Sequence, residues 1–206
     1  YYDLNFTNPG QTALGSETIG GRINGAIPIN DTASVIYAGE YATQSESDDN
    51  TINYDADYYL AEGGFKFIFN DLFIKSLTTK VSYEVMEADT SAGRAFQTPL
   101  ATGHAYFGWA DNFLATPATG IEDTYFTAVA TGAYDTKLVL AYHMLDPETD
   151  TTFDEYGDEF NIWLTKTFNK KYTVGLKYAD YSGDGSVANP KSTDLSKFWA
   201  YFTLKF

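Results

Sequence analysis

The chain has 206 residues, no cysteine and a formal net charge of −15. The missing thiols exclude a disulfide framework, a zinc–thiolate site and a cysteine nucleophile, and the negative charge excludes nucleic acid as a partner because phosphates would be repelled. No apolar run approaches the roughly 20 residues of a membrane-spanning helix, so a membrane protein of this composition has to be a β-barrel.

Alternation of side chains with a period of two predicts strands along most of the chain, because successive strand residues point to opposite faces. The alternation is clear at 77–85 and 172–178 and poorer at 16–27 and 121–132. The chain opens inside the first strand, which predicts missing sequence upstream. The ten predicted strands are 1–7, 16–27, 33–44, 56–69, 73–88, 121–132, 136–145, 158–168, 172–182 and 195–206.

The connections between these strands alternate between two length classes. Outer-membrane barrels have short periplasmic turns and longer extracellular loops. The pattern therefore predicts a single barrel domain, 1–206, with every long loop outside the cell and both termini in the periplasm. The short connections are 28–32, 70–73, 132–136 and 168–172, and the long ones are 8–15, 45–55, 89–120, 146–157 and 183–194.

The last strand carries the clearest two-faced pattern. One row is Phe198, Ala200, Phe202, Leu204 and Phe206, and the other row is mixed. An apolar row facing lipid and a polar row facing a lumen is typical of a transmembrane strand. A terminal Phe206 resembles the signal read by the outer-membrane barrel insertion machinery. A soluble β-sandwich or a lipocalin-like barrel is the alternative.

Charged side chains within the strands are predicted to face the lumen. A Lys or Arg on the lipid face costs about 2–4 kcal/mol at the midplane. They form either a mixed-charge lining that selects solutes or mutual salt bridges that rigidify the wall. The predicted lumen residues are Arg22, Glu40, Glu62, Lys66, Lys80, Glu84, Lys137, Lys177 and Lys197.

The segment 89–120 is too long for a simple connection and is rich in aromatic residues. Because apolar patches of that size are uncommon on a surface, we expect it to fold into the barrel mouth and narrow it, or to pack against the inner wall. Aromatic faces with flanking polar groups suit carbohydrate-like solutes. The predicted constriction residues are Arg94, Phe96, His104, Tyr106, Trp109 and Asp111.

Acidic side chains collect in two predicted outer loops. Carboxylates are ligands that suit calcium, and such ions could bridge the loops to lipopolysaccharide; ordinary solvated loops are the alternative. The calcium candidates are Asp146, Glu148, Asp150 and Asp154, and no other cofactor is predicted.

An enzymatic function is not predicted. His104 and His143 are the only histidines, and the G-x-S-x-G elbow of lipases is absent. His143 lies three residues from Asp146 and could face an outer cleft, as in an omptin-like surface hydrolase, but that family's motifs are not present. A lone histidine on a barrel wall is usually a polar lumen residue.

From about residue 54 onward the chain resembles the C-terminal half of the alginate-export family of outer-membrane porins. The stretch 95–125 carries the most specific likeness, and the motifs are YDADYY at 54–59, AFQTPL at 95–100, HAYFGWADNFL at 104–114, GIEDTY at 120–125 and LKYAD at 176–180. The resemblance implies an eighteen-stranded barrel of which these would be the last ten strands. This chain departs from the family's basic lumen, since it has only two arginines, Arg22 and Arg94.

The sequence therefore predicts an all-β protein, a transmembrane antiparallel up-and-down β-barrel of a Gram-negative bacterial outer membrane. We expect a porin that passes small hydrophilic, carbohydrate-like or anionic solutes by diffusion. A barrel of about ten strands is filled by its own side chains, whereas sixteen to eighteen leave a channel. A plugged barrel that anchors acidic loops outside the cell is the alternative, with the surface hydrolase as a third.

Overall fold

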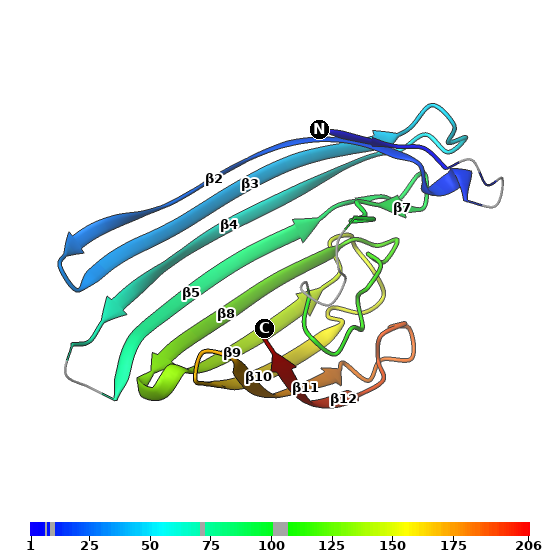
Figure 1. The fold of residues 1–206 in the computed structure, drawn as a ribbon. Coiled ribbons are helices and arrows are strands. Elements are labelled where there is room, and N and C mark those ends of the chain that lie inside the picture. The colour runs from blue at the N-terminus through cyan, green and yellow to red at the C-terminus, as the bar shows by residue number, and fades with distance from the viewer. Residues whose placement is uncertain (7, 9–10, 71–72, 101–106) are drawn as a thin grey trace.

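One antiparallel sheet of ten strands dominates the computed structural model, which describes residues 1–6, 8, 11–70, 73–100 and 107–206 (Figure 1). The strands follow one another across the sheet in chain order, as a meander. They are β1 (Tyr2–Leu4), β2 (Ser16–Asn30), β3 (Ala33–Glu46), β4 (Asp55–Ile68), β5 (Ile74–Met86), β8 (Ile121–Gly132), β9 (Thr136–Asp146), β10 (Gly157–Phe168), β11 (Tyr172–Gly183) and β12 (Leu195–Leu204). The predicted all-β class and the ten-stranded antiparallel meander are confirmed.

The remaining elements are short and lie in the connections. β6 (Ala88–Asp89) and β7 (Arg94–Ala95) pair as a separate two-stranded sheet inside the longest one, and η1 (Thr12–Leu14) and η2 (Ala133–Asp135) are single 3-10 turns. No helix among the described residues is long and apolar enough to cross a membrane.

Short turns gather at one end of the sheet and long loops at the other (Figure 1). The β10–β11 turn shows why one of the short turns is tight. Asn169 and Lys170 both have positive φ, 51° and 58°, and Lys171 N donates to Phe168 O at 3.0 Å. Two left-handed central residues match the twist of a hairpin, and asparagine tolerates that conformation well.

The sheet is curled but open, with β1 and β12 at its two edges (Figure 1). β1 covers only Ser16–Thr18 of β2, and β12 pairs with β11 on one side. The sequence predicted a closed barrel. In the described part of the chain the two edges do not pair with each other, and the sheet is open.

The two faces of the sheet differ sharply in polarity. One cross-strand row on the outer face runs through Val81, Phe126, Tyr142 and Phe160, and each of these side chains is between 39% and 49% exposed. Large apolar side chains exposed in such numbers over one face are unusual for a protein surrounded by water. The concave face instead carries most of the buried polar side chains.

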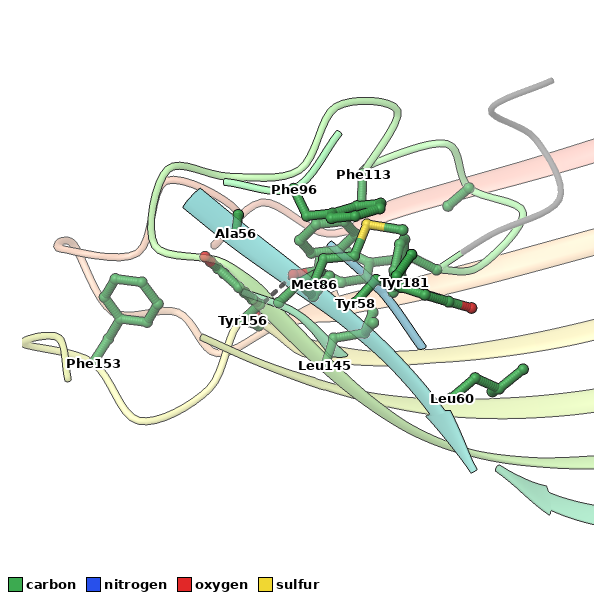
Figure 2. Close-up of a cluster of buried hydrophobic side chains, with 14 of the residues drawn as sticks. Ala56, Tyr58, Leu60, Met86, Phe96, Phe113, Leu145, Phe153, Tyr156 and Tyr181 are labelled. Carbon is green, nitrogen blue, oxygen red and sulfur yellow. Dashed lines mark hydrogen bonds between the residues drawn. The ribbon is translucent and has the colours of Figure 1, made fainter. Parts of the chain in front are cut away.

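The hydrophobic core lies at the long-loop end of the concave face rather than along the whole sheet. Met86, Ile121 and Leu145 from the strands are at most 1% exposed, and Tyr156 from the β9–β10 loop is fully buried. Figure 2 shows Phe96 and Phe113 of the long connection within the same cluster. The long connections therefore pack on the strands.

Candidate solute pathway on the concave face

The register places all nine predicted lumen residues on the concave face. This face presents even-numbered residues of β2–β5 and odd-numbered residues of β8–β12, because partners across each strand pair point the same way. The residues are Arg22, Glu40, Glu62, Lys66, Lys80, Glu84, Lys137, Lys177 and Lys197.

Several of these charges are paired across neighbouring strands. Arg22 Nη1 lies 2.5 Å from Glu40 Oε2, and Lys80 Nζ lies 2.7 Å from Glu62 Oε2. Ser82 Oγ donates to the same Glu62 oxygen at 3.0 Å. Salt bridges that solvent still reaches contribute little stability, so their main effect is to fix a pattern of charge along the wall.

A second set of polar groups is buried deeper, near the long-loop end. The Tyr58 hydroxyl donates to Glu84 Oε1 at 2.7 Å. His143 Nδ1 lies 2.7 Å from Asp123 Oδ2, and the Tyr125 ring stacks on the imidazole with centroids 5.0 Å apart. Buried charges need such partners, because an unpaired one would be strongly unfavourable.

We expect Tyr58→Phe to lower the free energy of unfolding by about 1–3 kcal/mol, because Glu84 would keep its burial and lose a hydrogen bond to a charged acceptor. Urea titration of the refolded protein measures this change. Tyr41→Phe is the matched control, since the exposed Tyr41 hydroxyl also donates to a carboxylate, Asp57 Oδ2, at 3.0 Å. Equal effects of the two variants would contradict the assignment.

Between these groups the concave face contains a cavity of about 480 Å³. Its lining includes the paired charges of β2–β5 together with Tyr125 and His143. Phe96 and Phe107 from the long connection also border it. The cavity is thus a polar space partly covered by aromatic side chains, large enough for a small solute.

The connection between β5 and β8 is fastened to the concave face through Glu159. Its carboxylate, on β10, accepts hydrogen bonds from the backbone N–H groups of Trp109 and Ala110, the latter at 2.8 Å. Gly108 has φ +87°, and a Cβ at this position would collide with the Glu159 carboxylate. Only glycine can bring the backbone this close.

Further contacts attach the same connection to β4 and to β12, which lie in opposite halves of the sheet. Phe96 packs on Tyr58 of β4 with centroids 5.6 Å apart. Asp111 Oδ2 lies 2.9 Å from Lys197 Nζ of β12. The described parts of this connection, before and after 101–106, therefore contact strands that are far apart in the sheet order.

The side chain of Gln44, on β3, holds the backbone of Gln97 in the first part of this connection. Gln97 N donates to Gln44 Oε1 at 2.9 Å, and Gln44 Nε2 donates back to Gln97 O at 2.9 Å. The Tyr54 hydroxyl donates to the same Gln44 oxygen at 3.1 Å. Burial raises the pKa of Tyr54 to about 12, so the phenol remains a hydrogen-bond donor even at a pH where an exposed tyrosine would ionise.

The six predicted constriction residues have different positions. Arg94 belongs to the β6–β7 hairpin, and Phe96, Trp109 and Asp111 make the contacts described above. His104 and Tyr106 lie outside the described residues.

The predicted calcium ligands do not converge. In the described part of the chain no group of three or more metal-ligating side chains is found. Glu148 Oε2 instead accepts a hydrogen bond from Ala88 N at 3.0 Å, which ties the β9–β10 loop to β6. Among the described residues Asp146, Asp150 and Asp154 form no such group with Glu148, and calcium binding stays a prediction.

The sequence did not predict the residues that hold the β5–β8 connection against the concave face. Glu159 lies in the predicted strand 158–168, and the alternation of Asn161 and Trp163 assigns it to the inward row, but its hydrogen bonds to the backbone of Trp109 and Ala110 have no sequence signal. Gln44 and Gly108 had no sequence signal, because their roles depend on partners about 50 residues away in the chain. The partner of His143 is Asp123 rather than the nearby Asp146.

The chain matches no protein-family model, no curated protein and no solved structure. The resemblance to the alginate-export porins therefore stays a prediction.

Proposed function

We propose that this chain forms part of an outer-membrane β-barrel channel through which small hydrophilic solutes diffuse. The observation that carries the proposal is the contrast between the two faces of one continuous sheet. Its outer face exposes aromatic and aliphatic side chains over many strands, while its concave face holds paired charges around a cavity. A sheet with lipid on one side and water on the other needs this contrast.

The proposal includes pairing of both open edges within the membrane. Unpaired backbone N–H and C=O groups are not tolerated in hydrocarbon, and among the residues that the structure describes β12 and most of β2 have no strand partner on one side. Ten strands closed on themselves would leave little lumen. Solute passage therefore requires further strands between β12 and β2, from the same polypeptide or from another copy.

In this channel the segment 107–113 forms the constriction. It lies against the concave face and is fixed to β10 and β12 through Glu159 and Lys197. A solute would pass beside it through the cavity bordered by Phe107 and by the charge pairs of β2–β5. The channel would select solutes by their size and by their interaction with the fixed charges of the wall, without a covalent step.

Solute flux into proteoliposomes tests the proposal. We expect the purified, heat-modifiable protein to make liposomes permeable to ions and to monosaccharides, with permeability falling steeply for larger sugars. Liposomes without protein and with heat-denatured protein are the controls. Folded protein that passes neither ions nor sugars would reject the channel and favour the plugged surface anchor.

A further inference from the structure

The two ends of the outer face differ in charge. Toward the long loops its charged side chains include the carboxylates of Asp57, Glu122, Asp146, Asp158 and Asp180. At the end with the short turns (Figure 1) most charged side chains are lysines, namely Lys75, Lys166, Lys170, Lys171 and Lys205. Among the described residues of this end, Asp31 and Asp135 are the acidic ones. In a chain of net charge −15, this end is therefore locally basic.

The lysines of the short-turn end have no carboxylate partner in the described part of the chain. No salt bridge between described residues includes Lys75, Lys166, Lys170, Lys171 or Lys205. The concave face differs in this respect, because Lys80 pairs with Glu62 and Lys197 pairs with Asp111. The ammonium groups of the short-turn end can therefore interact with negative charge outside the chain.

Lys166 is held against aromatic rings where the apolar outer face meets the short turns. It lies on the outer face of β10, in the same row as Leu164. Its Nζ is 5.3 Å from the ring centroid of Tyr134, in the β8–β9 turn, and 5.2 Å from that of Phe168. Ring faces attract an ammonium group through their quadrupole, so this charge is kept beside apolar surface.

Further aromatic side chains lie at the same end of the sheet. Phe73 packs on Tyr134 with ring centroids 6.4 Å apart, and Tyr172 stacks on Phe202 with centroids 6.2 Å apart. All four rings are exposed. Aromatic rings gather at the headgroup level of a bilayer, and lysine stems extend over apolar surface to bring their charge to that level. A dissolved anion needs no exposed aromatic surface, so the combination indicates a lipid headgroup.

We infer that the short-turn end binds the headgroups of anionic phospholipids through a lysine–aromatic rim (Tyr134, Lys166, Phe168, Lys170, Lys171). The lipid phosphate lies beside the ammonium groups, and the acyl chains lie along the apolar outer face. A zwitterionic headgroup gains less, because its own cation opposes the lysines. The carboxylates of the long-loop end repel anionic lipid, which confines the preference to one end. This inference deepens the proposed function by naming a lipid class, and it rests on the outer face lying in a bilayer.

Quenching by nitroxide-labelled lipids tests the rim, because a chain without cysteine accepts a fluorophore at one chosen position. Leu164→Cys reports on the outer face beside Lys166, and Met144→Cys reports on its other end, beside Asp158. The protein is reconstituted in phosphatidylcholine vesicles that contain labelled phosphatidylglycerol or labelled phosphatidylcholine. At Leu164→Cys we expect phosphatidylglycerol to quench at a roughly fivefold lower mole fraction, and about 1 M salt should remove the difference. At Met144→Cys we expect no preference for phosphatidylglycerol.

Variants of Lys166 in the Leu164→Cys protein separate the charge from the packing. Lys166→Gln should remove most of the preference for phosphatidylglycerol, and Lys166→Arg should retain it because the charge and the contact with the rings are kept. Lys66→Gln is the matched control, since Lys66 also lies near the short-turn end but on the concave face, and its lipid preference should be that of the original protein. An unchanged preference in folded Lys166→Gln would reject the assignment to this lysine.

The same measurement distinguishes a failure of this inference from a failure of the proposed function. Equal quenching by the two lipids at Leu164→Cys would keep the outer face in the bilayer and overturn the preference for anionic lipid. Quenching by neither lipid at either position would place the outer face outside the bilayer, and would reject the membrane channel and this inference together.

Discussion

Replacing Glu159 by alanine is expected to free the segment 107–113 from the concave face and to increase ion conductance and sugar flux severalfold. The Glu159 carboxylate accepts two backbone hydrogen bonds, from Trp109 and Ala110, in a fully buried position. Each such bond to a charged acceptor contributes about 1.5–3 kcal/mol. Its loss leaves the buried Ala110 N–H without its acceptor and the Trp109 N–H with only the long contact to Asn161 Oδ1 at 3.4 Å, and hydration of the released segment restores these hydrogen bonds.

Conductance of single channels in planar bilayers measures this effect, and protease cleavage within 107–113 measures the release of the segment. Gly108→Ala is an independent route to the same result, because its Cβ would displace the Glu159 carboxylate while all charges are kept. Asp158→Ala is the control, since it removes the neighbouring carboxylate from the outer face. Unchanged conductance in both Glu159→Ala and Gly108→Ala would contradict the constriction.

The strands could be predicted because their determinants are local. Side-chain alternation and turn length identified all ten, including 16–27 and 121–132, where alternation is poor. Hydrogen bonding to neighbouring strands holds those two strands in place of a clear pattern of their own. β8 pairs along its length with both β5 and β9, and β2 pairs with β3 over 14 of its 15 residues.

The candidate site was predictable only in part, for a physical reason. A period of two assigns a side chain to a face, so the shared face of Arg22, Lys80 and Lys177 follows from the sequence. Which side chains meet depends on register and on the path of the 87–120 connection. The proximity of Trp109 to Lys177, and of Gly108 to Glu159, results from that path. The curl and the open edges depend on cross-strand twist, which alternation does not encode.

The identity of the solvent on the outer face decides the membrane assignment, and two adjacent residues of β2 can test it. Ile23 points to the outer face and is 67% exposed, while Asn24 points to the concave face and is also exposed. In water both positions would tolerate lysine with little change, because exposed substitutions away from special features rarely matter. A bilayer makes the two positions unequal.

We therefore expect Ile23→Lys to lower the free energy of unfolding in lipid bilayers by about 2–4 kcal/mol, the cost of a lysine facing hydrocarbon near the midplane. Asn24→Lys should change it by less than about 1 kcal/mol, since its ammonium would lie in the lumen near the carboxylates of Glu40 and Glu62. Reversible urea unfolding in phospholipid vesicles measures both variants. Equal stabilities would place the outer face in water and would reject a membrane barrel, because no lipid-facing sheet accepts a mid-strand lysine without cost.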